Sequence, residues 1–247
     1  KSPLPLDDNG VFEQQDLREQ ITFDFGADLY YRDRASVSAA DVNITGEITQ
    51  GLGAIRDVEI DYDGSRLLFA MRTPFDPNLD EEDLPTWNIW QYTFATDDVP
   101  AELRRVIASN LTAEIGHDIM PKYLPDGRIV FTSSRSERTA LCGGHSLVVT
   151  NLYRMNADGT GLHQLSQNAL SEFCPTVMND GRILYNRWEY VDKGAGAVQP
   201  LWAMHPDGSQ SEEIYGDNIT VPPVFNQARH VPGRNDLVVC LGAGHAP

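Results

Sequence analysis

Short apolar runs alternate with polar turn residues along most of this chain. In one repeated pattern an Asp-Gly or Pro-Gly pair, which favours a tight hairpin turn, is followed by β-branched and aromatic residues suited to a buried strand. Its glycines, Gly64, Gly127, Gly181 and Gly233, lie 63, 54 and 52 positions apart. The four copies are Asp61–Phe69, Leu124–Phe131, Met178–Tyr185 and a degenerate Val231–Val239.

A second hairpin pattern lies between these copies. Leu152-Tyr-Arg-Met155 leads into Asp158-Gly159, and Leu201-Trp-Ala-Met204 leads into Asp207-Gly208. A short further strand follows each, so every unit holds four strands in up-and-down order. Four-stranded units that recur about every 50 residues are typical of a β-propeller. The sequence therefore predicts an all-β chain of propeller blades at about 53–110, 117–168 and 172–218, with a truncated fourth at 222–247.

Residues 1–50 fit none of these units, and we interpret them as an N-terminal extension with one or two strands. A propeller has at least four blades and usually more. We therefore expect the propeller in this chain to be incomplete and the chain to be a fragment of a larger protein or assembly. The segment Pro100–Val106 is compatible with a turn of helix or with the fourth strand of the first blade.

Composition narrows the classes of partner. With 36 acidic and 19 basic residues the net charge is −17, which disfavours nucleic acid and anionic lipid and favours cationic partners. No stretch approaches the roughly 20 apolar residues that a membrane span requires. The chain starts at Lys1 rather than Met, and we expect an exported protein. Three cysteines allow one disulfide at most, so they define no disulfide framework.

Two sets of residues carry a resemblance to known families. Leu124-Pro-Asp-Gly-Arg-Ile-Val-Phe131 and Met155-Asn-Ala-Asp-Gly-Thr160 resemble TolB-like propeller repeats of exported bacterial proteins. More narrowly, several segments resemble proteins related to the hydrazine synthase alpha subunit. These segments are Phe131–Arg135, Cys142–His145, Asn151–Met155, Asn186–Asp192 with Leu201-Trp202, and Gly242–His245.

The narrower resemblance implies a periplasmic or extracellular protein whose propeller packs against haem-bearing, and possibly basic, domains or subunits in electron transfer. Covalent haem attachment requires a Cys-x-x-Cys-His run, which this sequence lacks. Any haem c would therefore lie on a partner or on another segment. We interpret the chain as a non-catalytic propeller scaffold or binding module in such an assembly. The alternative is a metal- or haem-dependent enzyme, either a redox catalyst or a propeller lyase or hydrolase, with its site in the central channel.

Two pairs of residues are candidate metal ligands. Cys142 and His145 share a glycine-rich loop, where a thiolate and an imidazole could hold a soft metal. The simpler interpretation is a turn between the second and third strands of a blade. His117 and Asp118, like Glu172, precede predicted innermost strands and could hold a divalent cation in the channel. The alternative for these acids is a strand-edge cap or an ion pair with an arginine of the next blade.

Arg187-Trp188-Glu189-Tyr190 is a candidate cofactor-binding surface, because its aromatic side chains could pack on a haem edge or a partner. Packing between blades is an equally good interpretation. Arg229, His230 and His245 are weaker candidates in the fourth blade. Asp80-Glu-Glu-Asp83 could dock a basic cytochrome or be a solvated acidic loop, and no Gly-x-Ser-x-Gly elbow supports nucleophilic catalysis.

Overall fold

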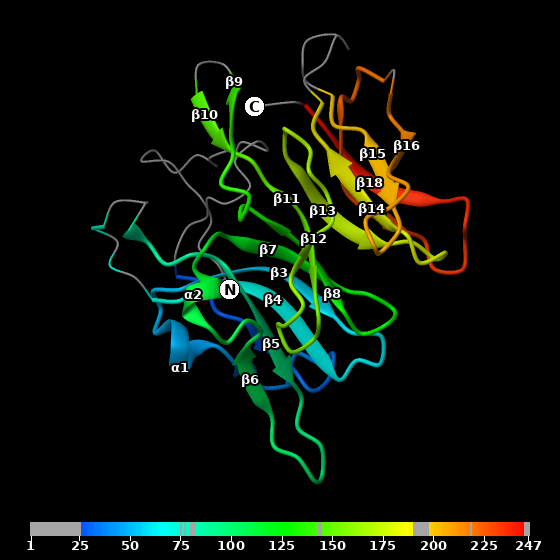
Figure 1. Ribbon diagram of the computed structural model, residues 1–247. Coiled ribbons are helices and arrows are strands. Elements are labelled where there is room, and N and C mark those ends of the chain that lie inside the picture. Colours follow the sequence, from blue (N-terminus) through cyan, green and yellow to red (C-terminus); the bar gives the residue numbers. More distant parts are fainter. Residues whose placement is uncertain are drawn as a thin grey trace, which may run out of the picture.

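Three four-stranded antiparallel sheets and one two-stranded sheet make up most of the structure (Figure 1). The computed structural model describes residues 26–74, 76, 78–79, 83–142, 145–189, 198–217 and 219–244, without the side chains of Cys142 and His145. The prediction of an all-β chain with up-and-down four-stranded sheets is confirmed. Pro100–Val106 contributes a strand rather than a helix.

The first three sheets follow the same order from the innermost to the outermost strand. The first contains β3 (Ala54–Ile60), β4 (Arg66–Arg72), β5 (Asn88–Thr93) and β6 (Glu102–Arg105). The second contains β7 (Asp118–Tyr123), β8 (Ile129–Ser133), β11 (Asn151–Met155) and β12 (His163–Gln164). The third contains β13 (Glu172–Val177), β14 (Ile183–Arg187), β15 (Leu201–Met204) and β16 (Glu212–Tyr215).

The fourth sheet pairs β17 (Val224–His230) with β18 (Val238–Ala243). A separate hairpin of β9 (Thr139–Cys142) and β10 (His145–Val148) lies between β8 and β11 in the chain. Near the N-terminal side, β1 (Tyr30–Tyr31) pairs with β2 (Val42–Asn43), and α1 (Gly46–Thr49) follows. A second short helix, α2 (Asn110–Ala113), joins the first and second sheets.

The inner hairpins form where the repeated turn signal predicts them. Gly127 and Gly181 adopt φ of 83° and 87°, a left-handed conformation that glycine tolerates best. In each turn the aspartate side chain accepts a hydrogen bond from the main-chain N–H of the residue that follows the glycine. In the first of these turns, Arg128 N–H donates to Asp126 Oδ1 at 3.1 Å. The Asp-Gly pairs therefore fix the β7–β8 and β13–β14 hairpins locally.

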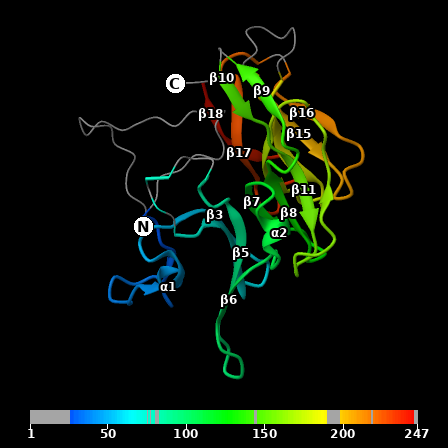
Figure 2. The ribbon, with the colours of Figure 1, turned by 60° about the vertical axis from the view of Figure 1, so that its left-hand side comes forward.

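Apolar side chains fill the space between neighbouring sheets. Val106 and Ile107 after β6 pack with Phe131 and Met155 of the second sheet. Leu165 after β12 packs in the same way with residues of the third sheet, including Tyr185. The inner strands also follow one another, because β7 contacts both β3 and β13, and β13 contacts β17. The sheets thus form an arc around the inner strands, as the colour sequence in Figure 2 shows.

The segment before β3 packs on the first sheet. Ala27, Leu29 and Ile48 join a cluster with Phe69 and Tyr92 of that sheet. The main-chain N–H groups of Gly26 and Ala27 both donate to the Gly53 carbonyl. These contacts hold the segment against the first sheet.

Candidate functional site at the inner strands

All four inner strands carry the same irregularity. Their pairing with the second strand shifts register at one point, and a non-glycine residue there has a positive φ. These residues are Asp57, Met120, Cys174 and Gln227, with φ of 57°, 54°, 53° and 49°. A β-bulge of this kind bends the strand and re-aims its side chains. The four bulges bring equivalent side chains toward a common centre.

The bulge residues are linked from sheet to sheet. The Met120 N–H donates to Asp57 Oδ2 at 3.1 Å, and the Cys174 N–H donates to Met120 Sδ at 3.2 Å. The Gln227 main chain in turn hydrogen-bonds the Cys174 thiol. The first three bulge residues, Asp57, Met120 and Cys174, therefore each use the side chain to accept from the main chain of the next bulge. The resulting series of contacts joins all four sheets.

A second set of side chains lies two residues after each bulge residue. It consists of Glu59, Lys122, Thr176 and Arg229. Glu59 forms an ion pair with Lys122 of the second sheet. It forms another with Arg229 of the fourth sheet, whose Nη2 lies 3.2 Å from Glu59 Oε2. Arg229 Nη1 also lies 3.4 Å from Thr176 Oγ1. We call these four residues the inner ring, because their contacts connect all four sheets.

A cavity of about 300 Å³ opens between the bulges and the inner ring. Asp57, Lys122, Arg229 and Gln227 supply its polar wall, while Pro175 and Ala228 supply apolar surface. A neighbouring hollow of about 230 Å³ shares its two cationic side chains. A concave site with apolar surface and a few polar groups is the usual form of a ligand site.

Burial shifts the pKa values of two groups that line the cavity. Burial lowers the pKa of Lys122, and the carboxylate of Glu59 opposes that change. Burial raises the pKa of Cys174 to about 12, so its thiol is protonated near neutral pH and is a poor nucleophile. The Arg229 side chain is 51% exposed. The accessible chemistry of the cavity is therefore a cationic group beside an apolar wall.

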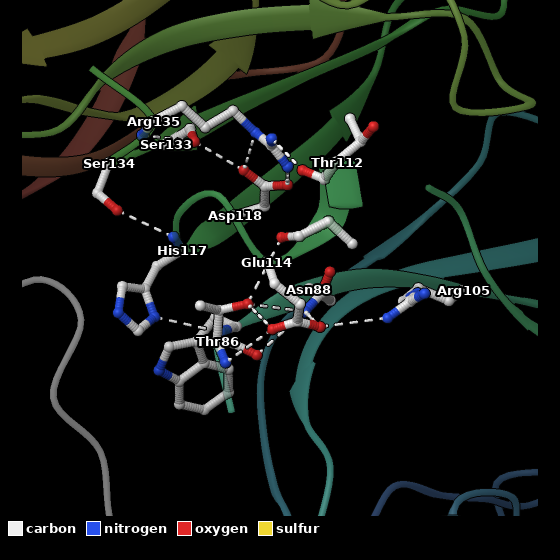
Figure 3. Close-up of polar contacts among 12 residues, drawn as sticks. Thr86, Asn88, Arg105, Thr112, Glu114, His117, Asp118, Ser133, Ser134 and Arg135 are labelled. Carbon is white, nitrogen blue, oxygen red and sulfur yellow. Dashed lines mark hydrogen bonds and ion pairs between the residues drawn. The ribbon is translucent and has the colours of Figure 1, made fainter. Parts of the chain in front are cut away.

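His117 and Asp118 lie in a polar network at the start of β7 (Figure 3). The Trp87 N–H donates to His117 Nδ1 at 3.2 Å. Asp118 receives the Arg135 guanidinium, with Nε to Oδ1 at 2.9 Å and Nη2 to Oδ2 at 2.5 Å, and Ser133 Oγ at 2.7 Å. Arg135 follows β8 in the same blade, so Asp118 pairs within its own blade rather than with an arginine of the next one. Asp118 is buried and does not line the cavity.

The other acid that begins an inner strand, Glu172, is also buried. Burial raises its pKa, and Arg187 of the same sheet lies 4.0 Å from it, from Nη1 to Oε1. Asn151 Nδ2 donates to Glu172 Oε2 at 3.3 Å. Asp118 and Glu172 thus share an arrangement in which an arginine near the end of the second strand faces the acid. Within the described part of the chain, no group of three or more His, Cys, Asp and Glu side chains is placed to hold a metal ion.

The described residues of the candidate cofactor surface, Arg187, Trp188 and Glu189, differ in burial and in contacts. Trp188 is 2% exposed and packs in a core with Trp87 and Phe173, as the blade-packing interpretation expects. The Arg187 guanidinium lies over the Trp202 ring, 4.3 Å from its centroid. Glu189 lies 4.0 Å from Arg187, from Oε1 to Nε. Only Arg187, among these described side chains, combines partial exposure with an aromatic contact.

Several predicted residues fall outside the described structure. These are Tyr190, His245, Glu81 and its neighbours 80 and 82, and the side chains of Cys142 and His145. The main chains of Cys142 and His145 face each other across the β9–β10 hairpin. Of the weaker candidates, Arg229 lines the cavity and His230 lines the neighbouring hollow. His230 Nδ1 accepts from the Asn179 N–H at 3.1 Å.

The inner ring was not found from the sequence, although a signal for the bulges exists. Met120-Pro121 and Cys174-Pro175 each interrupt a strand pattern seven residues before a hairpin glycine, and Asp57 has the same offset from Gly64. Proline inside a strand marks a bulge or an edge. A repeated proline at one offset therefore predicts a repeated bulge.

No protein-family model matches the sequence, and no curated protein matches it. Among solved structures, hydrazine synthase from Kuenenia stuttgartiensis is similar over 78% of this chain, with a TM-score of 0.58 and 18% identity. The fold is that of a β-propeller. This chain spans 29% of the hydrazine synthase chain. TolB from Acinetobacter baumannii is similar over 91% of this chain and 49% of its own, with a TM-score of 0.48 and 11% identity.

In the part of the chain that the structure describes, neither short helix is long and apolar enough to cross a membrane. At 18% identity the likeness to hydrazine synthase establishes the fold alone.

Proposed function

We propose that this chain is a non-catalytic propeller module that binds a basic, haem-bearing partner in an exported electron-transfer assembly. In this proposal residues 1–50 are an extension and residues 51–247 are the propeller-forming part. The resemblance to hydrazine synthase alpha relatives supports the kind of assembly. Because the sequence lacks a Cys-x-x-Cys-His run, the proposal assigns haem c to a partner or another segment.

The observation that carries the proposal is the hairpin between β5 and β6. Residues 95–102 are all exposed, and the hairpin extends away from the sheets (Figure 1). It presents three acids, Asp97, Asp98 and Glu102, and its exposed apolar residue Val99. Its turn is ordered by a hydrogen bond from the Thr96 N–H to the Val99 carbonyl at 2.9 Å. An acidic, ordered projection is suited to a cationic protein surface.

The test uses a small basic c-type cytochrome as the probe. We expect it to bind this chain measurably at low salt and about tenfold more weakly at physiological ionic strength, because exposed charges are screened. The variant Asp97→Asn/Asp98→Asn/Glu102→Gln should lose at least about tenfold in affinity.

The matched control changes the same charge elsewhere, in Asp158→Asn/Asp207→Asn/Asp236→Asn, whose acids lie in exposed turns. Equal losses in the two triple variants would show that only the net charge attracts the cytochrome. No binding at low salt would reject the proposed partner class.

A further inference from the structure

The inner ring holds more positive than negative charge. Lys122 and Arg229 share the single carboxylate of Glu59, and Thr176 is neutral. Asp57 also lines the cavity, but its carboxylate is paired with Arg56, with Nε to Oδ2 at 2.7 Å, so Arg56 offsets its charge. In a chain of net charge −17, this cavity is therefore a local cationic site.

One of the two cations is available to a ligand. Lys122 is mostly buried against Glu59, whereas Arg229 is half exposed and reaches Glu59 through Nη contacts of 3.2 and 3.5 Å. A guanidinium carries five N–H donors in a planar fork that matches a carboxylate. Arg229 can thus keep Glu59 and still donate to a second carboxylate in the cavity.

The rest of the cavity limits the size and nature of that ligand. At about 300 Å³ it has the volume of a small metabolite rather than of a large cofactor. Pro175, Ala228 and Val58 provide apolar wall, and Gln227 also lines the cavity. A short carbon chain would contact the apolar wall while its charged end meets Arg229.

We propose that the cavity between the four bulges is a binding site for a small aliphatic carboxylate, with Arg229 as its anion-recognising group and Lys122 as a buried positive charge beside it. This site is independent of the β5–β6 hairpin, because it is built from the inner strands and the hairpin joins the outer ones. It does not depend on the proposed haem-bearing partner.

The test is calorimetric titration of the chain with succinate, compared with uncharged succinamide of nearly the same shape. We expect saturable succinate binding and none for succinamide. Arg229→Gln should weaken succinate binding by at least about tenfold, because the charge-assisted fork is lost. Arg234→Gln is the matched control, since Arg234 is an exposed arginine paired with Asp236, and it should leave binding unchanged.

The variant Glu59→Gln should not weaken succinate binding, in contrast to Arg229→Gln. It removes the carboxylate that competes for Lys122 and Arg229, so succinate should bind as tightly or several-fold more tightly. A loss of binding in Glu59→Gln with an unchanged thermal unfolding midpoint would overturn the proposal, as would equal losses in Arg229→Gln and Arg234→Gln. If Glu59→Gln does not fold, the comparison of succinate affinity between Arg229→Gln and Arg234→Gln still tests the proposal. Cytochrome binding by Arg229→Gln should be unchanged, so the two proposals can fail separately.

Discussion

Asp118 and Arg135 form a two-point ion pair inside the second sheet, with Nε–Oδ1 and Nη2–Oδ2 distances of 2.9 and 2.5 Å. Both side chains are almost fully buried, at 1% and 4% exposure. Burial raises the pKa of Asp118, and the hydrogen bonds from Arg135 and Ser133 oppose that rise. Arg135 also donates to the Thr112 carbonyl, which ties the α2 region to the inner strand. The acid at the start of β7 therefore has a structural role in the second sheet.

Replacing Asp118 by Asn should strongly destabilise the protein. The substitution leaves Arg135 charged and buried without its counter-ion, a change that typically costs about 3–5 kcal/mol. Urea denaturation followed by tryptophan fluorescence measures the loss.

The control for this variant is Asp236→Asn, which breaks an exposed ion pair. The Arg234 side chain of that pair is 57% exposed and the Asp236 side chain is 70% exposed. Exposed pairs contribute about 0–1 kcal/mol. Similar losses of unfolding free energy in the two variants would contradict the structural role assigned to Asp118.

Gly159 should be far less replaceable than Gly127. Both glycines have φ of 83° in Asp-Gly turns, so alanine costs each about 1 kcal/mol of left-handed strain. A Cβ at Gly159 would lie 2.3 Å from the Val106 carbonyl oxygen of the first sheet, whereas a Cβ at Gly127 meets nothing within 4 Å. We expect Gly159→Ala to lose about 3 kcal/mol or more.

Chemical denaturation of Gly159→Ala and Gly127→Ala compares the two positions directly. The outer turn of the second sheet must move away from the first sheet to relieve the overlap in Gly159→Ala. Equal midpoints for the two variants would show that this close approach is not needed for stability.

The fold was predictable because its turns are encoded locally. Asp126-Gly127 and Asp180-Gly181 fix hairpins through a positive φ and a hydrogen bond two residues along, so each copy can be identified without its neighbours. The inner ring has no such local code. Glu59, Lys122 and Arg229 differ in type and meet only because four bulges align them across as many as 170 positions.

The two arginines that face inner-strand acids were likewise not predictable from local sequence. The sequence predicts that Asp118 and Glu172 precede inner strands, but not that their partners are Arg135, just after β8, and Arg187 of β14. Those contacts depend on antiparallel register, which pairs Asp118 with Ser133 and Glu172 with Arg187. Register places Arg187 opposite Glu172, and it places Ser133, two residues before Arg135, opposite Asp118. Spacing along the chain does not reveal either position.

Cys174 should resist alkylation in the folded protein. Its thiol is buried, accepts from the Gln227 main chain and lies 2.9 Å from Asn226 Oδ1, and burial raises its pKa to about 12. The thiolate is the reactive form. With iodoacetamide at pH 8, mass spectrometry of peptides should find Cys174 modified only in urea concentrations that unfold the chain. Rapid modification under native conditions would mean that the bulges open locally.

Stability should fall as the pH decreases from about 6.5 toward 4 because of His117. Burial and the nearby Arg72 lower the pKa of His117 to about 4, from a value of 6.5 in the unfolded chain. The folded state therefore binds fewer protons than the unfolded state in this window, so the contribution of His117 is complete above pH 6.5 and is lost on acidification. The slope for one such group is at most about 1.4 kcal/mol per pH unit. The Trp87 N–H donates to Nδ1, so protonation of that nitrogen would also leave two donors facing each other. His117→Asn keeps an acceptor near Nδ1 and cannot titrate, so its free energy of unfolding should depend less on pH than that of the parent protein. The control is His163→Asn, which replaces an exposed histidine outside the His117–Trp87 contact. Parallel pH profiles for the parent and His117→Asn, measured by urea denaturation at half-unit pH intervals, would refute the assignment.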